Sequence, residues 1–376
     1  MSATRPIRIL HVLGAMNRAG VETWLMHVLR NIDRDRFRMD FLVHETNRGD
    51  YDDEIESLGS RVLVCAGPSN PLAYGSNFLR VLRGHGPYDV VHSHVHHYSG
   101  FVLRLARSAG VRTRIAHSHS DTANLDSQSS LCRRLYLWTG RRWISRNASW
   151  KVAASNQAAA CLFGAAWPSD PSTSVLHCGL GFDSFEAHVD CASVRRELGF
   201  APDDFVIGHV GRFSPVKNHD LLLRIHAEAL RLRPESRLLL VGEGLLDQAI
   251  RRTAESLGIA DRIRFAGARS DVARLMLGAM DVFVMPSLYE GLGLAAVEAQ
   301  AAGLPTVLSD QIPPEVNTVP GLVRFVSLND RAASWASIVL EHAGQIRMRQ
   351  IDALACVNQS HFNIHRSVRD LCQLYS

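Results

Sequence analysis

The sequence predicts an α/β protein built from two open, mainly parallel sheets. Short apolar runs rich in β-branched residues alternate with amphipathic helical stretches along the chain, a pattern typical of βαβ units. The runs are nearly continuous in apolar residues, as expected for strands that helices cover on both faces. A chain of 376 residues is too long for one ordinary core, so we expect two domains.

The expected strands fall into two series. The first lies at 7–14, 39–45, 61–67, 88–94, 112–119, 151–156 and 172–179, and the second at 205–211, 237–244, 263–267, 282–287 and 305–310. Helical stretches lie between them, at 20–33, 99–110, 219–234, 245–258, 271–280 and 292–303, and a further interrupted one covers about 334–374. The segment 181–204 lacks strand character, so we expect the domain boundary near residues 185–204.

Composition describes an ordinary globular protein, with 46% hydrophobic residues, 21% charged residues and a net charge of +4. Its seven cysteines are scattered without a C-x-x-C pair, which argues against a disulfide framework or a structural zinc site. The sequence shows no apolar run of membrane-spanning length and no signal-peptide pattern. We therefore expect a cytoplasmic protein, with peripheral contact at the inner face of the plasma membrane as an option.

Loops that follow strands are the first places to look for a ligand, because open α/β sheets bind ligands beyond the carboxyl ends of their strands. The loop at 14–22 carries glycines into a helix start and suits a phosphate, although it is not the G-x-G-x-x-G dinucleotide fingerprint and a tight turn is the alternative. In the loop at 211–220, Arg212 and Lys217 could clamp a diphosphate. Two solvated surface cations are the alternative there.

The stretch YEGLGLAAVEAQAAG at 289–303 places two carboxylates in a run of small and apolar residues. Glu290 and Glu298 are a little over two helical turns apart, so they are not close neighbours. The amides of residues 291–294 can face an anion, and a carboxylate such as Glu298 can accept hydrogen bonds from a ribose diol. Helix capping or ion pairing is the alternative for both, most of all for Glu290 near the helix start.

Histidines end two strands of the first series, at 91–97 and 115–121. His92, His94 and His96 would share one face of a strand, so a metal site of the H-x-H type is conceivable, with Asp121 as the main carboxylate partner. The alternative is a row of hydrogen-bonded histidines that lines a polar substrate pocket.

The segment 131–151 has six basic and no acidic residues, with one tyrosine and three tryptophans interleaved: Tyr136, Trp138, Trp143 and Trp150. A basic, aromatic helix suits an anionic membrane surface. No nucleic-acid recognition motif accompanies it, so we expect no nucleic-acid partner. A helix with inward aromatic side chains and solvated arginines is the alternative.

Together these loops resemble the retaining glycosyltransferases of family 4, which have the GT-B fold. EGLGLAAVE at 290–298 is similar to that family's E-x₇-E motif, GRFSPVKN at 211–218 to its Arg and Lys loop, and AGVE at 19–22 to its first glycine turn. HCGLGFDSF at 177–185 resembles the segment that ends the family's N-terminal domain. The stretch 48–62 adds a likeness to members that build capsular polysaccharides and exopolysaccharides.

The resemblance implies two Rossmann-like parallel-sheet domains that face each other across a cleft. It assigns 1–185 to an acceptor-binding domain, with a last helix at about 355–376 packed back on it, and 186–354 to a nucleotide-sugar domain. Leu292, Cys178 and Ala19 depart from residues that are common in the family, which affects loop geometry and removes no charged group.

The resemblance also implies a role for each site residue. Glu298 would bind the ribose hydroxyls, Glu290 would face the donor sugar, and Arg212 and Lys217 would neutralise the diphosphate. His119 would lie near the transferred sugar. The remaining donor-binding positions would be Gly20, Gly211, Arg269, Gly291, Leu292, Gly293 and Leu294.

By the same resemblance the protein is a retaining transferase in polysaccharide biosynthesis. It would move a sugar from a nucleotide diphosphate sugar, by default a UDP-sugar, to a glycan or lipid-linked acceptor. No metal or other cofactor is expected, since two fixed cations can neutralise the diphosphate. The alternatives are a sugar-nucleotide epimerase or a phosphorylase on the same fold, a catalytically silent nucleotide-sugar-binding protein, and, more remotely, a metal-dependent hydrolase that uses the histidines.

Overall fold

A computed structural model describes residues 5–119, 130–345 and 348–376 of the chain. The chain divides into two compact units. Unit 1 comprises the described residues up to Leu180 together with Ile364–Ser376, and unit 2 comprises Gly181–Asn363. The chain thus leaves unit 1 once and returns to it with its last helix.

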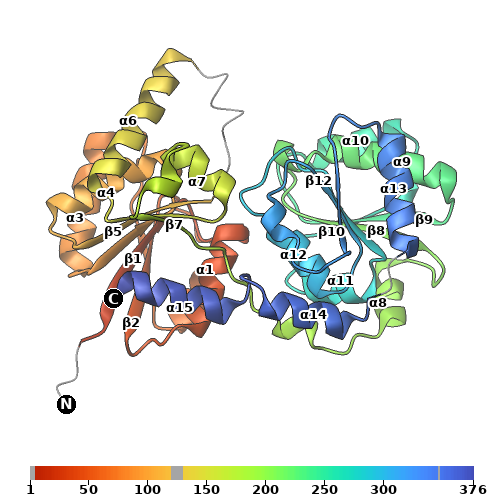
Figure 1. Cartoon of the computed structure of the whole chain (residues 1–376), viewed down its shortest axis with the longest axis horizontal. Helices are drawn as coiled ribbons and strands as arrows, with labels where there is room; N and C mark the ends of the chain where they lie inside the picture. Colours follow the sequence, from red (N-terminus) through yellow and green to blue (C-terminus); the bar gives the residue numbers. More distant parts are fainter. Residues whose placement is uncertain (1–4, 120–129, 346–347) are drawn as a thin grey trace. The chain divides into compact units, whose positions relative to one another are not determined.

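Unit 1 is a seven-stranded parallel sheet with the order β3-β2-β1-β4-β5-β6-β7. The strands are β1 (Ile7–Leu13), β2 (Phe37–Val43), β3 (Val62–Val64), β4 (Val90–Ser93), β5 (Thr113–Ser118), β6 (Trp150–Ala153) and β7 (Thr173–Val175). The helices are α1 (Gly20–Asn31), α2 (Asp52–Ser57), α3 (Pro71–His85), α4 (Ser99–Ser108), α6 (Leu131–Asn147), α7 (Asn156–Phe163) and α15 (Ile364–Tyr375). Figure 1 shows α3, α4 and α6 on one face of this sheet and α1 and α15 on the other.

Unit 2 is a six-stranded parallel sheet with the order β10-β9-β8-β11-β12-β13. Its strands are β8 (Phe205–Val210), β9 (Ser236–Val241), β10 (Ile263–Gly267), β11 (Val282–Met285), β12 (Thr306–Ser309) and β13 (Val323–Val326). Its helices are α8 (Cys191–Leu198), α9 (His219–Leu232), α10 (Asp247–Ser256), α11 (Val272–Gly278), α12 (Leu294–Ala301), α13 (Ala332–Gln345) and α14 (Gln350–Gln359). In Figure 1, α9, α10 and α13 cover one face, where Trp335 and Val339 of α13 are buried in the core.

Each sheet starts in the middle and is built outward in both directions, so its strand order reverses once. The reversal lies between β1 and β4 in unit 1 and between β8 and β11 in unit 2. At such a point the chain leaves two neighbouring strands toward opposite faces, which opens a crevice at their carboxyl ends. The α/β class predicted from alternating apolar runs is therefore confirmed, and the reversal points show where to look for ligands.

The last helix, α15, is fixed to unit 1 by buried contacts on the face that α1 covers. The indole Nε1 of Trp24 donates a hydrogen bond of 3.1 Å to the hydroxyl of Ser367. Tyr375 is 3% exposed and lies against the ring of Phe37, with centroids 6.3 Å apart. An amphipathic C-terminal helix is held there by the apolar area that it buries.

One expectation about the elements was wrong. The helix expected over 131–151 ends at Asn147, because the amide of Ser149 already donates to the carbonyl of Arg114 at 2.8 Å and starts the pairing of β6 with β5. The segment 181–204, expected to lack strand character, contains no strand and carries α8. β13 (Val323–Val326) was not expected, because its residues are mostly only partly buried and its sequence VRFV includes an exposed arginine. Among the described residues no helix is both long and apolar enough to cross a bilayer.

Two glycines let the loops after β8 and β9 touch through their backbones. Gly242 has φ of +139°, and a Cβ there would lie 2.1 Å from the carbonyl oxygen of Gly211. The amide of Gly242 also donates a hydrogen bond to the carbonyl of Gly267 at 2.9 Å. This bond fixes the end of β10 beside the loop after β9. A side chain at this position must therefore push apart the loops that carry the candidate site.

We predict that Gly242→Ala lowers the stability of unit 2 by about 1–3 kcal/mol for overpacking a filled position, in addition to the backbone strain of its positive φ. Gly258→Ala is the matched control, because Gly258 also has positive φ, of +69°, but a Cβ there would meet no atom within 4 Å. It should cost only about 1 kcal/mol of backbone strain. Thermal unfolding of both variants gives the comparison, and equal shifts in melting temperature would contradict the predicted steric contact.

Candidate active site

The candidate site in unit 2 is built where the strand order reverses, from the loops after β8 and β11. The amide of Leu288 donates to the carbonyl of Val216 at 2.8 Å. The side-chain amide of Asn218 donates to the carbonyl of Pro286 at 3.1 Å. Asn218 adopts the left-handed conformation with φ of +53°, which asparagine tolerates better than most residues. These bonds fasten the two loops together, so that side chains from both meet.

Lys217 and Glu290 form an ion pair across the two loops. The Nζ atom of Lys217 lies 2.5 Å from Oε1 of Glu290, and the two side chains are only 18% and 12% exposed. A Cβ on Gly211 would lie 3.0 Å from Cε of Lys217, so the glycine lets the lysine stem cross the backbone. Ion pairing was one of the alternatives that the sequence allowed for Glu290. The structure shows this ion pair, and its cation is Lys217, the lysine expected at the diphosphate.

Glu298 is the opposite case. It lies partly buried on α12, and its carboxylate forms no hydrogen bond or ion pair with any residue that the structure describes. Burial raises the pKa of Glu298 to about 7. A carboxylate without a partner in such surroundings is costly unless a ligand supplies hydrogen-bond donors. The ion-pairing alternative therefore does not hold for Glu298 among the described residues.

The start of α12 lies between the two glutamates. Gly293 adopts φ of +80°, and no side chain caps the helix. The first amides of a helix have no partner within the helix and carry partial positive charge. Leu292 is 5% exposed and packs into the protein, so this position can offer only its backbone to a ligand. The role of residues 291–294 in binding an anion stays a prediction.

The other expected cations differ in availability. Arg212 is exposed and forms no side-chain hydrogen bond with any described residue. Arg269 is held by Asp271, with bonds of 2.7 and 2.8 Å, and by Glu197 at 3.0 Å. Its guanidinium is therefore largely occupied by carboxylates, and its place in a donor site stays a prediction. Gly20 opens α1 in unit 1, where Ala19 provides no side-chain cap.

In unit 1 the expected histidine lies in a larger cluster of five imidazoles on β1, β4 and β5. Its members are His11, His92, His94, His117 and His119. The expectation that His96 shares a strand face with His92 and His94 was wrong, because β4 ends at Ser93 and His96 turns away with φ of +51°. Asp121 lies outside the described residues.

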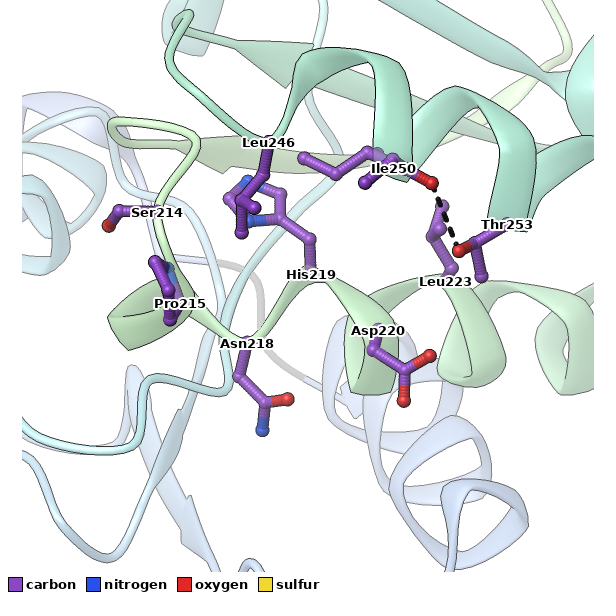
Figure 2. Close-up of a pocket in the computed structure, with 10 residues that line it drawn as sticks. Ser214, Pro215, Asn218, His219, Asp220, Leu223, Leu246, Ile250 and Thr253 are labelled. Carbon is purple, nitrogen blue, oxygen red and sulfur yellow. Dashed lines mark hydrogen bonds between the residues drawn. The ribbon is translucent and has the colours of Figure 1, made fainter.

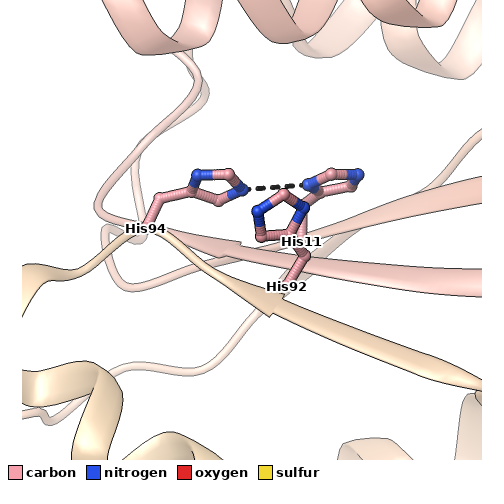
Figure 3. Close-up of side chains that lie close together, drawn as sticks. All are labelled: His11, His92 and His94. Atoms are coloured by element: carbon pink, nitrogen blue, oxygen red, sulfur yellow. Dashed lines mark hydrogen bonds between the residues drawn. The ribbon is translucent and has the colours of Figure 1, made fainter. Parts of the chain in front are cut away.

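The cluster contains two groups of three histidines whose ring nitrogens lie within 4.8 Å of one another. They are His11 with His92 and His94, shown in Figure 3, and His94 with His117 and His119. In the structure these nitrogens are largely engaged in hydrogen bonds with one another, such as His94 Nδ1 to His119 Nε2 at 2.8 Å. The second interpretation made from the sequence, hydrogen-bonded strand-end histidines, is thus the arrangement that the structure shows.

His11 and Tyr375 were not predicted as members of this cluster, whereas His117 lies in the strand-end segment 115–121 that was predicted. The signal was present, because His11, His92 and His117 each lie near the carboxyl end of an expected strand. Which strands are neighbours decides whether such residues meet, and strand order is not written in any single segment.

A small hollow of about 170 Å³ opens between α9 and α10. Figure 2 shows its lining, which includes Ser214, Pro215, His219 and Ile250. None of the charged residues expected in the donor site lines it. It lies behind the loop that carries Lys217, so we do not assign it to the candidate site.

Two parallel sheets, each with one reversal of strand order and a loop leading into a helix at that point, define a doubly wound α/β class of protein. Residues 19–176 match the glycosyl transferase 4-like domain, and residues 192–335 match the glycosyl transferases group 1 family. The Bacillus subtilis (strain 168) protein EpsF, named as a glycosyltransferase, is 34% identical over 372 residues, which cover 98% of this chain and 96% of EpsF. The chain therefore belongs to the family 4 type of glycosyltransferases.

Other relatives are more distant. A D-inositol 3-phosphate glycosyltransferase of Streptomyces scabiei is 29% identical, with 89% of this chain and 77% of the relative covered. Anabaena HepE, solved with UDP and glucose, superposes with a TM-score of 0.80 at 21% identity, covering 98% of each chain. Sucrose-phosphate synthase of Thermosynechococcus elongatus gives a TM-score of 0.80 at 20% identity, again over 98% of each chain. The expected GT-B fold is thus confirmed.

The raised pKa of Glu298 predicts how stability depends on pH. The folded pKa of about 7 lies above the ordinary value of 4.5, so the folded protein binds the proton more tightly than the unfolded chain. Stability is therefore lost as pH rises from about 5 to 8. We predict that Glu298→Gln removes this loss and stabilises the ligand-free protein at pH 8 by up to about 3 kcal/mol, and by little at pH 5.

Urea denaturation of both proteins at pH 5 and pH 8 measures the effect. Glu255→Gln serves as the control, because Glu255 is an exposed carboxylate on α10 and its loss should leave the pH dependence unchanged. An equal effect of the two substitutions at pH 8 would show that Glu298 carries no burial penalty.

Proposed function

We propose that this glycosyltransferase uses a UDP-sugar as donor, retains the configuration of the transferred sugar, and acts on a glycan or lipid-linked acceptor. The observation that carries the proposal is the arrangement at the reversal point of unit 2. There an arginine and a lysine belong to the loop after β8, and the lysine is paired with Glu290 of the loop after β11. That second loop leads into the uncapped start of α12, which carries the unpartnered Glu298. Each of these groups suits one part of a nucleotide diphosphate sugar.

Glu298 is proposed to accept hydrogen bonds from the two ribose hydroxyls. Its missing partners would then be supplied by the ligand, and the hydroxyl donors would favour the charged carboxylate. The structures of HepE with UDP and of Staphylococcus aureus TarM with UDP support a uridine donor. The name of EpsF, and the likeness of 48–62 to exopolysaccharide-building members, support a polysaccharide product.

The diphosphate is proposed to lie between Arg212, Lys217 and the amides at the start of α12. Charge builds on the leaving phosphate as the glycosidic bond breaks, and fixed donors aimed at that position stabilise the transition state more than the ground state. Glu290 holds Lys217 in the absence of donor and would face the donor sugar when the phosphate attracts the lysine. Because these groups can neutralise the diphosphate, we propose that no metal ion is needed.

Retention is proposed to follow from attack on the same face from which the phosphate leaves. In this scheme the acceptor oxygen bonds to the anomeric carbon, the bond to the phosphate oxygen breaks, and the acceptor proton passes to that phosphate. No enzyme carboxylate then forms a bond to the sugar. An inverted product, followed by NMR, would refute retention, and trapping of a glycosyl–enzyme adduct on any carboxylate would refute same-face attack.

Arg212→Ala is the sharpest test of the diphosphate site. Arg212 has no partner among the described residues, so its loss should leave the melting temperature unchanged while kcat falls about 100- to 1000-fold, as for one preorganised donor. Arg252→Ala is the control, since Arg252 is also exposed, on α10, and should keep full activity.

Lys217→Ala should lose similar activity but also some stability, because it leaves Glu290 buried without its cation.

Transfer is measured with UDP-glucose and related donors, with and without chelator, against lipid-linked sugar acceptors. Near-normal turnover by a folded Arg212→Ala protein would refute the diphosphate site. Activity abolished by chelator would refute the metal-independent scheme. Conversion of the donor without acceptor, or dependence on inorganic phosphate, would instead identify the epimerase or phosphorylase alternatives.

The surface of α6 supports a lipid-linked acceptor. Leu131, Leu135, Tyr136 and Trp138 are 80%, 63%, 46% and 58% exposed, and exposed arginines accompany them on the same helix. Trp143 does not belong to this surface, because it packs on Phe101 with centroids 5.9 Å apart. Figure 1 shows the helix extending beyond its neighbour α4. Exposed apolar side chains that lie among cationic side chains suit the surface of an anionic membrane.

We predict that the protein floats with vesicles that contain anionic lipid and not with purely zwitterionic vesicles. The double change Leu135→Ala and Trp138→Ala should abolish flotation, because it removes the exposed apolar area. Leu232→Ala, at a leucine 60% exposed on α9, is the control and should not matter. If the wild-type protein fails to float with anionic vesicles, α6 is an ordinary solvated helix.

A further inference from the structure

The histidine cluster of unit 1 contains two separate chains of hydrogen-bonded rings. In the first, Nδ1 of His119 lies 3.7 Å from Sγ of Cys178, and its Nε2 lies 2.8 Å from Nδ1 of His94. Nε2 of His94 then lies 3.0 Å from Nδ1 of His11, the bond drawn in Figure 3. The order of this chain is thus Cys178, His119, His94 and His11.

The second chain is parallel to the first. The hydroxyl of Tyr375 lies 2.9 Å from Nδ1 of His92, and Nε2 of His92 lies 3.1 Å from Nδ1 of His117. The rings of His92 and His117 are stacked, with centroids 5.2 Å apart and planes inclined by 4°. Each ring-to-ring bond joins Nε2 of one histidine to Nδ1 of another, and the hydroxyl of Tyr375 also meets an Nδ1. Both chains therefore run in one direction from Nδ1 to Nε2 through each ring.

The rings are neutral. Burial lowers the pKa of His11 and of His119 to about 3, and burial with the neighbouring rings holds the pKa of His94 well below its usual range. Among the described residues no carboxylate bonds to any ring of the first chain, whose other partners are only Cys178 and imidazoles.

A neutral imidazole carries one N–H and one lone pair, which couples the rings to one another. If His94 donates its single N–H to His119, its other ring nitrogen must accept a hydrogen bond from His11. If His94 instead donates to His11, it must accept a hydrogen bond from His119. The tautomers of His119, His94 and His11 therefore change together or not at all. Only two states of the chain satisfy both of its ring-to-ring bonds.

The free end of the chain selects between the two states. Nε2 of His11 is fully buried and has no partner among the described residues. In one state this atom is an N–H without an acceptor, and in the other it is a lone pair without a donor. A buried donor without a partner is rarer in proteins than an under-used acceptor. The favoured state of the first chain therefore places the proton of each of its rings on Nδ1.

We propose that the His11–His94 chain fixes His119 as a neutral imidazole with its proton on Nδ1, so that His119 meets the sugar substrate as a hydrogen-bond donor and not as a base. His94 and His11 are then positioning residues. In the ligand-free state the N–H of His119 faces only sulfur, which is a weak acceptor, so a sugar hydroxyl can take its place. Contact with substrate rests on the proposed function, whereas the tautomer of the free protein does not.

Nitrogen-15 NMR of histidine-labelled, ligand-free protein tests the tautomers directly. We expect His119, His94 and His11 each to show a protonated Nδ1 and a bare Nε2 at neutral pH. His94→Leu should leave His119 as a mixture of tautomers, because the donor to its Nε2 is gone. Tyr375→Phe, in the second chain, should leave His119 unchanged. A protonated Nε2 or a doubly protonated ring at His119 in the wild type would overturn the proposal, as would a tightly bound metal ion on these nitrogens.

Activity then tests what the tautomer does. His119→Asn keeps an N–H donor close to the position of Nδ1 and should retain kcat within about tenfold, whereas His119→Asp offers an acceptor there and should lose about 100-fold or more. Greater activity of the Asp variant than of the Asn variant would identify His119 as a base and overturn the donor role. If no variant and no wild-type protein transfers sugar, the proposed function fails while the NMR result still decides the tautomer.

Discussion

The reversal of strand order within each sheet is the constraint on which the sites depend. Two neighbouring parallel strands there send their chains to opposite faces, so their carboxyl ends are not covered by the same helix. In unit 2 this leaves the loops after β8 and β11 free to meet, and a backbone bond between Leu288 and Val216 fastens them. In unit 1 the same reversal places β1 beside β4, so that His11 pairs in register with His92.

Electrostatics differ between the two sites built on this constraint. Unit 2 uses charges, and Lys217 and Glu290 are paired with each other. Glu298 has no such partner, and burial raises its pKa to about 7. Neutral hydrogen-bond donors suit such a carboxyl group. Unit 1 uses neutral groups, since five imidazoles share a small volume and charge on one would repel charge on the next.

The sequence predicted the parts of this structure that depend on local patterns and missed those that depend on strand order. Alternating apolar runs were enough to predict both sheets, and the spacing of Glu290 and Glu298 placed them correctly in a loop and a helix. The ion pair of Glu290 with Lys217 joins residues 73 positions apart, and only the neighbourhood of β8 and β11 brings them together. His96 was misplaced for a local reason, because a residue two positions beyond His94 belongs to a strand only while the strand continues.

The same distinction explains why the sequence left both a metal site and a row of hydrogen-bonded histidines open. In sequence, an H-x-H pattern gives the types and spacing of side chains but not the direction in which each ring nitrogen points. The register of β1, β4 and β5 turns those rings edge to edge, with ring nitrogens 2.8 to 3.1 Å apart. Tetrahedral ligands on one zinc ion, at about 2.0–2.1 Å from the metal, would have to be separated further, and each such bond would cost a hydrogen bond already made. Nitrogens that already satisfy one another are better suited to passing on the position of a proton than to sharing a cation.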